Sequence, residues 1–225
     1  PSLFLYDTGI VVTTDCGEDL GELGCYGEDG CSDYIAHRIP MIVRWPGGAK
    51  GHVDRGLHYN LDLAPTLAEL FGVQRWNGWQ GKSYAAAVRD AGASGHEHLV
   101  LSQCCHGAMR SVRFGPWMYI RVMHDFFHLY PREMLFNVVD DPHETTNLAE
   151  ARPEVCAQAA RLMLTWHEDM MRGMPDAVDP LWTVMREGGP EHSRHHLSAY
   201  CKRLEATGRG QYVPELRRRH PYEPL

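Results

Sequence analysis

The feature that most constrains the fold is a run of consecutive β-branched residues at positions 10–14, with the sequence IVVTT. Val, Ile and Thr favour strands, and an unbroken apolar run of strand length is typical of a strand covered on both faces, as in a parallel sheet. The run ends at residues 15–17, Asp-Cys-Gly, where glycine permits a sharp turn. Because ligands in open α/β sheets bind beyond the carboxyl ends of the strands, Asp15 lies where such chemistry is expected.

Strand and helix signals then alternate. A second strand is expected over residues 40–45 (PMIVRW), ended by Pro-Gly-Gly at 46–48. A helix is expected after Asp62, which would cap its N-terminus, and before Gly72, which would close it. Its apolar face has helical spacing and comprises Leu63, Leu67, Leu70 and Phe71. This alternation indicates the α/β class.

After residue 96 the pattern changes to short strand candidates separated by turns, at 98–102, 111–114, 117–121 and 134–138. We expect these strands to form a small antiparallel sheet. A helix from Pro153 to about Gly173 is expected to cover the sheet with an apolar face made by Val155, Ala159, Leu162 and Trp166. From Pro175 onward the chain is rich in Pro, Gly, His and Arg, and one short helix is expected around residues 192–206.

Composition argues against two classes of partner. The formal net charge of −7 argues against nucleic acid, because phosphate backbones select basic faces. The basic run at residues 217–219 is interpreted as part of a solvated tail. No apolar run approaches the roughly 18–20 residues that cross a bilayer, so no membrane partner is expected.

Cysteine usage bears on localisation. The seven cysteines are odd in number and irregularly spaced, and no Cys-x-x-Cys pair occurs. Mostly free thiols favour a reducing compartment, and therefore a cytoplasmic location.

Three stretches stand out as motifs: residues 11–24 (VVTTDCGEDLGELG), residues 38–47 (RIPMIVRWPG) followed by 62–67 (DLAPTL), and residues 135–149 (LFNVVDDPHETTNLA). In this order they resemble the sulfatase family of the alkaline-phosphatase superfamily. The family's similar patterns are (S/T)-D-(H/N)-G-E with a following Leu-Gly step, R-(V/I)-P-(L/M)-I-(V/I)-x-W-P-G with D-(L/I)-x-P-T-(L/I), and L-(Y/F)-(D/N)-L-x-x-D-P-x-E-x-x-N-L.

The resemblance implies the C-terminal part of an alkaline-phosphatase-like α/β sandwich, followed by a small antiparallel sheet with a packed helix. The expected parts are residues 1–105 for the α/β catalytic domain, 106–174 for the sheet and helix, and 175–225 for a C-terminal tail. The chain opens with Pro1 and lacks both the family's C/S-x-P-S-R nucleophile motif and its upstream acidic pair. We therefore expect a missing N-terminal portion of the same protein to supply them, and we assign no catalytic residue within this chain.

By resemblance, Asp15 would give one carboxylate oxygen to a divalent metal ion, with Ca²⁺ preferred over Zn²⁺, Mn²⁺ or Mg²⁺. A turn-capping role is the second interpretation of Asp15. Cys16 stands where the family usually has a His or Asn that binds the metal or reaches the substrate. Because a thiolate is soft and suits Zn²⁺ better than Ca²⁺, Cys16 either coordinates weakly, selects another metal, impairs the site or is merely a packed thiol.

Two further residues are candidates for substrate binding. Asp29 stands where related sulfatases carry a basic His or Lys, and its carboxylate would repel sulfate. The alternative interpretation is that Asp29 has no functional role and only makes the loop soluble. His106 follows a strand and could line the pocket, unless it only forms a strand-end turn. The spacing of His192, His195 and His196 could hold a metal on a helix, but we interpret them as surface histidines. Residues 140–147 are interpreted as structural.

The sequence thus predicts a sulfuric-ester hydrolase whose nucleophile, a formylglycine made from an upstream cysteine or serine, lies outside this chain. Its expected substrate is a small-molecule or carbohydrate sulfate ester. The competing hypotheses are a phosphodiesterase or phosphonate monoester hydrolase of the same superfamily, and a catalytically impaired fragment that acts as a binding or structural module. The 225 residues alone are expected to be inactive.

Overall fold

The computed structural model describes residues 7–223, and these residues fall into two compact units. The first unit contains the described residues up to Gly17 together with Arg38–Leu99. The second contains Glu18–His37 and the described residues from Val100 onward. The predicted domain boundaries after residues 105 and 174 stay predictions.

The first unit contains a two-stranded antiparallel sheet. Strand β1 (Ile10–Thr13) pairs with β4 (Met41–Arg44), and both lie within predicted strand segments. The prediction of a parallel sheet covered on both faces is wrong for β1. Val12 and its cross-strand neighbour Ile42 are 53% and 64% exposed, because no third strand joins this sheet within residues 7–223 and one face stays open.

Helices also lie in the first unit: η2 (Asn60–Asp62), α3 (Leu63–Leu70) and α4 (Ala85–Asp90). α3 is the helix predicted after Asp62. It closes at Gly72 as predicted, because a φ of +68° at this glycine lets the Val73 N–H donate to the Ala68 carbonyl at 2.8 Å.

Asp62 does not cap α3 with its side chain, contrary to the prediction. Its fully buried carboxylate accepts hydrogen bonds from the Tyr59 N–H at 2.9 Å and the Lys82 N–H at 2.7 Å, and one oxygen lies 2.9 Å from His96 Nε2. The carboxylate therefore joins three segments of the first unit. The sequence around Asp62 does not predict its two distant partners, Lys82 and His96.

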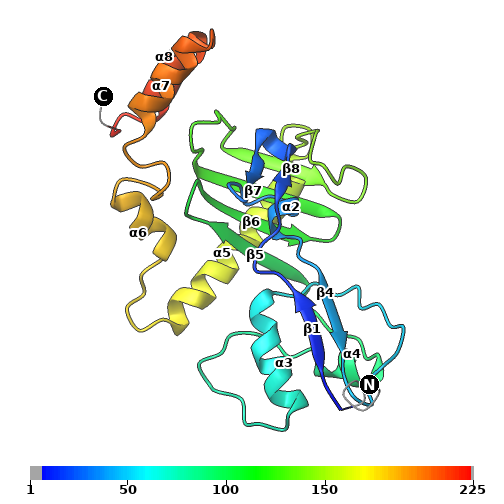
Figure 1. Cartoon of the computed structure of the whole chain (residues 1–225). Helices are drawn as coiled ribbons and strands as arrows, with labels where there is room; N and C mark the ends of the chain where they lie inside the picture. The colour runs from blue at the N-terminus through cyan, green and yellow to red at the C-terminus, as the bar shows by residue number, and fades with distance from the viewer. Residues whose placement is uncertain (1–6, 224–225) are drawn as a thin grey trace. The chain divides into compact units, whose positions relative to one another are not determined.

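A four-stranded sheet dominates the second unit (Figure 1). Its order is β5-β6-β7-β8, made by β5 (His98–Gln103), β6 (Ala108–Phe114), β7 (Trp117–His124) and β8 (Glu133–Asn137). Strands β6 and β7 are antiparallel, as are β7 and β8. Gly115 and Pro116 form the turn between β6 and β7. The predicted small antiparallel sheet is confirmed.

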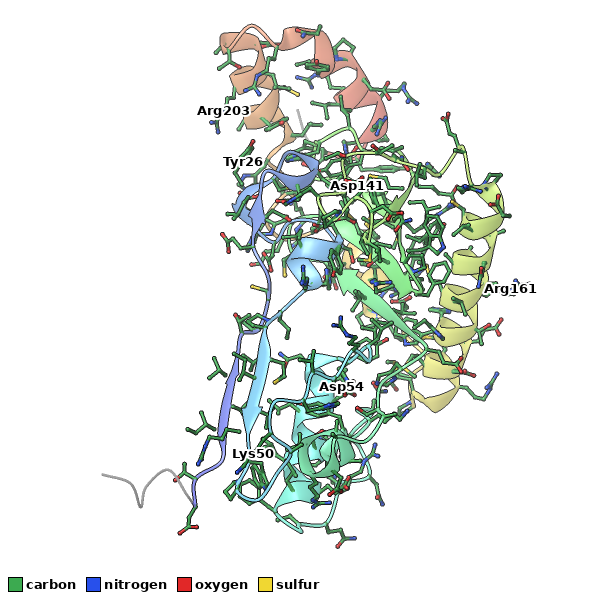
Figure 2. All side chains as sticks on the ribbon, turned by 90° about the vertical axis from the view of Figure 1, so that its right-hand side faces the viewer. Tyr26, Lys50, Asp54, Asp141, Arg161 and Arg203 are labelled. Carbon is green, nitrogen blue, oxygen red and sulfur yellow. The ribbon has the colours of Figure 1, made fainter. Side chains whose placement is uncertain are left out.

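Both faces of this sheet are apolar and both are covered. Successive residues of a strand point to opposite faces. On one face, Tyr119 of β7 shares a buried cluster with Ala159 of α5 (Pro153–Gly173). On the other, Ile120 shares a buried cluster with Cys25 and Cys31. Figures 1 and 2 show α5 and α2 on opposite sides of the sheet.

The second cover is the segment of residues 18–37. It contains only short elements, which are β2 (Asp19–Leu20), η1 (Glu22–Gly24), β3 (Tyr26–Glu28) and α2 (Tyr34–His37). β2 and β3 pair with each other in an antiparallel sheet of their own.

α5 has the bounds that the sequence predicts. Val155, Leu162 and Trp166 are partly buried and pack against the cluster around Ala159, so the predicted apolar face is confirmed. The opposite face carries exposed polar side chains such as Arg161, which points away from the sheet in Figure 2.

The described part of the tail contains helices α6 (Pro180–Arg186), α7 (Leu197–Ala206) and α8 (Val213–Arg219), with the single turn η3 (Gly210–Tyr212) between the last two. α7 is the short helix predicted there, but it begins at Leu197, five residues later than predicted. Its residues Leu197, Cys201 and Leu204 are buried in one cluster with Phe127, which follows β7.

No helix in residues 7–223 is long and apolar enough to cross a membrane.

The motif at residues 140–147 is structural, as predicted. The Asp141 carboxylate accepts hydrogen bonds from the Thr145 N–H and hydroxyl at 3.1 and 2.9 Å, and from the Thr146 N–H at 2.9 Å. The Asn147 side chain accepts the Leu135 N–H at 3.0 Å, which ties the turn to β8.

A buried ion pair anchors α6 to the sheet. Arg110 of β6 donates two hydrogen bonds to the Asp179 carboxylate, at 2.8 and 2.9 Å, and the two side chains are 8% and 6% exposed. The guanidinium also lies 5.1 Å from the centre of the Trp166 ring. Burial opposes ionisation of Asp179, but the bonds and charge of Arg110 outweigh it and hold the pKa of that carboxyl below its usual range.

Replacing Asp179 with Asn should lower the free energy of unfolding by about 3–5 kcal/mol, because Arg110 would keep its charge in a buried place without a charged partner. The matched control is Asp169→Asn, which removes the exposed ion pair with Arg172 and should cost less than about 1 kcal/mol. Urea unfolding of both variants measures the difference. Equal losses would contradict the anchoring role of the buried pair.

Candidate functional site

Asp15 follows β1 at the end where ligand chemistry is predicted. Its carboxylate is exposed, and Oδ1 accepts hydrogen bonds from the Thr14 hydroxyl at 3.2 Å and the Cys16 N–H at 3.1 Å. The backbone N–H of Asp15 itself, the Thr14 hydroxyl and the Cys16 N–H lower the pKa of Asp15 below its usual range. An exposed, ionised carboxylate suits a divalent cation, and the same bonds also stabilise the turn.

Cys16 is a partly exposed, reduced cysteine beside Asp15. Across residues 7–223, no three or more His, Cys, Asp and Glu side chains lie close enough together to hold a metal ion. Asp15 and Cys16 can therefore provide only part of a coordination shell. Their roles as metal ligands stay predictions.

Asp29 and His106, the two residues predicted to bind substrate, lie together in the second unit, with His106 Nδ1 3.9 Å from Asp29 Oδ1. Gln103, the last residue of β5, joins the loops that carry them. Its amide donates to the Asp29 carbonyl, and its Oε1 accepts the N–H groups of Cys104 and Cys105 at 2.7 and 2.8 Å. Sequence reasoning missed Gln103, whose one signal is a polar residue at the end of an apolar strand.

His192 is a second residue that sequence reasoning missed at this place. Its Nδ1 lies 3.0 Å from His106 Nε2, and its backbone N–H donates to the Cys105 carbonyl at 3.0 Å. The neighbouring Ser193 hydroxyl donates to the His106 carbonyl. The tail therefore brings an imidazole to the predicted substrate-binding residues.

The histidine spacing at 192, 195 and 196 forms no helical metal motif. α7 begins at Leu197, so the three residues precede the helix, and His195 has a positive φ of 68°. His195 and His196 are exposed, in keeping with their interpretation as surface histidines. His192 differs from them through its contact with His106.

His106 and His192 form a hydrogen-bonded pair beside the Asp29 carboxylate. A neutral imidazole has one N–H donor and one acceptor nitrogen, so the two facing nitrogens of His106 and His192 share one proton. His106 Nδ1 is buried and has no hydrogen-bond partner among the described residues, and the nearest Asp29 oxygen is 3.9 Å from it. A protonated pair would attract an anionic ester, whereas Asp29 would oppose it.

Three other carboxyl groups are buried in the second unit: Asp19, Asp33 and Glu144, which are 0%, 0% and 3% exposed. The Tyr34 N–H donates to Glu144 Oε2 at 2.9 Å, but no protein N–H or O–H donor in the described part of the chain reaches Asp19 or Asp33. Burial first, and then the charge of Asp33, raise the pKa of both Asp19 and Glu144 to about 9. Asp19 and Glu144 therefore keep their protons at neutral pH, next to the carboxyl group of Asp33.

The fold and the order of its motifs define the C-terminal part of a sulfatase-type α/β protein. Residues 32–165 match the family described as N-sulphoglucosamine sulphohydrolase, C-terminal, and the chain belongs to this sulfatase family. The resemblance predicted from the motifs is thereby confirmed. His106 lies inside the matched region, whereas Asp15, Asp29 and His192 lie outside it.

A curated relative is the choline-sulfatase of Rhizobium meliloti (strain 1021), which is 32% identical over 158 residues. The alignment covers 65% of this chain and 28% of that protein. The chain thus spans less than a third of the length of this relative.

Solved structures show the same fold. A structure of a protein in complex with its substrate D-glucosamine-2-N,6-O-disulfate matches with a TM-score of 0.64 and 21% identity, over 76% of this chain and 36% of that one. A phosphonate monoester hydrolase from Silicibacter pomeroyi matches with a TM-score of 0.57 and 25% identity, over 74% of this chain and 35% of that one. The predicted α/β fold class is confirmed.

The buried, protonated carboxyl group of Asp19 should make stability depend on pH. Asp19 has a pKa of about 9 in the folded protein, against an ordinary value of 3.8, so the unfolded chain loses this proton first as the pH rises. The folded state is therefore destabilised progressively from about pH 4 to about pH 9. Asp19→Asn cannot ionise, so its gain in unfolding free energy over the parent should be small at about pH 4 and roughly 1–3 kcal/mol at about pH 8.

Urea unfolding across this pH range measures the gain. The matched control is Glu168→Gln, which neutralises an exposed carboxylate on α5 and should show a nearly flat difference. A gain for Asp19→Asn that does not grow with pH would show that the Asp19 carboxyl is ionised in the folded protein.

Proposed function

We propose that the protein to which this chain belongs is a sulfuric-ester hydrolase, and that the chain forms its C-terminal part. The match of residues 32–165 to a sulfatase family is the observation that carries the proposal. The chain corresponds to 28% of the choline-sulfatase, which supports a larger whole protein. The nucleophile and the remaining metal ligands would come from an N-terminal portion of that protein.

The contribution of this chain to a metal site would be Asp15, with Cys16 beside it. A bound cation would polarise the ester oxygens and orient the nucleophile. The exposed, ionised carboxylate of Asp15 favours Ca²⁺ because it offers a hard oxygen ligand. Zn²⁺ is favoured instead if the Cys16 thiolate coordinates, whereas Mn²⁺ and Mg²⁺ would bind through the Asp15 carboxylate in the place of Ca²⁺.

The proposed substrate is a small-molecule or carbohydrate sulfate ester. A choline-sulfatase and a structure that holds D-glucosamine-2-N,6-O-disulfate are among the proteins that this chain is similar to. His106, hydrogen-bonded to His192, would attract the anionic part of the substrate when the pair is protonated. Asp29 would select among esters, because a carboxylate accepts hydrogen bonds from hydroxyl groups and repels a second anion.

A second candidate is phosphonate monoester hydrolysis. The similarity to the enzyme from Silicibacter pomeroyi favours it, because that likeness reaches 25% identity over 74% of this chain. The family match favours the sulfatase over this second candidate.

The full-length protein should hydrolyse an aryl sulfate with a higher kcat/KM than the matched aryl phosphate and aryl phosphonate monoester. Initial rates on the three esters, which share one leaving group, measure the preference for the transferred group alone. The 225-residue chain serves as the control and should show no turnover on any of them. A clear preference for the phosphonate would replace the proposed activity with the second candidate.

Asp15→Asn in the full-length protein should lower both the bound metal and kcat/KM, the latter by about 100-fold or more, because the amide loses the charged oxygen ligand. Asp90→Asn, which alters an exposed carboxylate at the end of α4, is the matched control and should change neither. Elemental analysis and steady-state kinetics give the two readouts. If metal content and turnover both stay at the parent level, Asp15 only caps the turn.

A further inference from the structure

Two buried cysteines face each other beneath the sheet of the second unit. Cys25 and Cys31 are 2% and 0% exposed, and their sulfur atoms are 3.6 Å apart. We propose that they are a disulfide-forming pair, a modification site that closes the segment 25–31 when the protein is oxidised. The spacing of six residues and the odd number of cysteines gave no sign of this pair in the sequence.

The geometry favours this pair over others. A disulfide bond is about 2.05 Å long, so the two sulfurs need to approach by only about 1.5 Å. The segment between them contains Gly27, with a φ of +66°, and Gly30, which let it turn back on itself. Cys156 and Cys201 lie in two other buried clusters, so neither competes for these sulfurs.

Tyr130 completes the surroundings of the pair. Its hydroxyl donates to the Leu23 carbonyl at 2.6 Å, so its oxygen is left to accept. That oxygen lies 3.4 Å from the Cys25 sulfur and 3.3 Å from the Cys31 sulfur. The phenol thus holds both sulfur atoms at one place without placing a charge beside them.

The two thiols are not equivalent. The hydrogen bond between the two sulfurs is the largest influence on Cys25 and lowers the pKa of that thiol, with burial opposing it. The same hydrogen bond, together with burial, raises the pKa of Cys31. Since the thiolate is the nucleophile in thiol–disulfide exchange, the lowered pKa of Cys25 favours this residue as the one that attacks first.

The oxidation balances with a small-molecule disulfide as the oxidant. The Cys25 thiolate attacks one sulfur of that disulfide, a mixed disulfide forms, and one small thiolate leaves and takes up the Cys25 proton from solvent. Cys31 then loses its proton and attacks the Cys25 sulfur, which forms the protein disulfide and releases the second small thiol. Two protein thiols lose two electrons, and one small disulfide becomes two thiols.

Closure of the pair would fix the loop that carries Asp29. Asp29 lies between the two cysteines, and its carbonyl accepts the Gln103 amide. A cross-link at the ends of this short segment restricts the unfolded chain and should hold Asp29 beside His106. This consequence for substrate binding rests on the proposed function, whereas the disulfide itself does not.

The test is a thiol map of the full-length protein. The protein is refolded in glutathione buffers of increasing oxidised fraction, so that the oxidant reaches both sulfurs before they are buried. It is then unfolded, alkylated and digested. We expect Cys25 and Cys31 to lose alkylation together and to appear in one cross-linked product, while Cys156 and Cys201 stay alkylated. Full alkylation of Cys25 and Cys31 at the most oxidising ratio would overturn the proposal.

Variants give a second readout. Adding reductant should lower the Tm of the oxidised parent by several degrees, and this shift should vanish in Cys25→Ser and in Cys31→Ser. Cys156→Ser and Cys201→Ala are the matched controls and should keep the full shift. If a Cys25 or Cys31 variant does not fold, the thiol map of the parent protein still decides whether the disulfide forms. Loss of sulfatase activity in every form would refute the proposed function and leave this result unchanged.

Discussion

The second unit depends on a sheet that is apolar on both faces. β6 and the first half of β7 bury almost every side chain, so water must be excluded from both sides at once. α5 covers one face, and residues 18–37 cover the other. Because the second cover also carries Asp29, burial of apolar surface decides which loop comes to the end of β5. The hydrogen bonds of the Gln103 side chain then hold the loop that carries Asp29 close to His106.

The tail adds polar side chains to this frame. The Arg110–Asp179 pair joins α6 to β6, and the His106–His192 contact joins the segment before α7 to the loop after β5. Asp179 and His192 both lie beyond the region that matches the family. The tail, which lies outside the matched region, therefore places the imidazole of His192 beside the predicted substrate-binding residues.

Buried carboxyl groups in this protein are stabilised in two different ways. An unpaired buried charge is costly, so each group must either gain donors or keep a proton. Asp62 gains two backbone N–H donors and a histidine neighbour. Asp19 and Glu144 have too few donors and keep their protons instead, which makes the second unit sensitive to rising pH.

The sequence by itself determined the family, the strands β1 and β4, the small antiparallel sheet, the helices α3, α5 and α7, the closing glycine of α3 and the turn at residues 140–147. These follow from local periodicity and turn chemistry, which act over a few residues. Only the tertiary structure decided that β1 pairs antiparallel with one face open, that the Asp62 carboxylate contacts the Lys82 N–H and His96 rather than capping α3, and that His106 meets His192. The metal role of Asp15 was read from its motif and its place after a strand, and the fold adds only that its carboxylate is exposed. The physical reason is that such partners are distant in sequence. The residues next to a given residue do not determine which distant segment will pack against it.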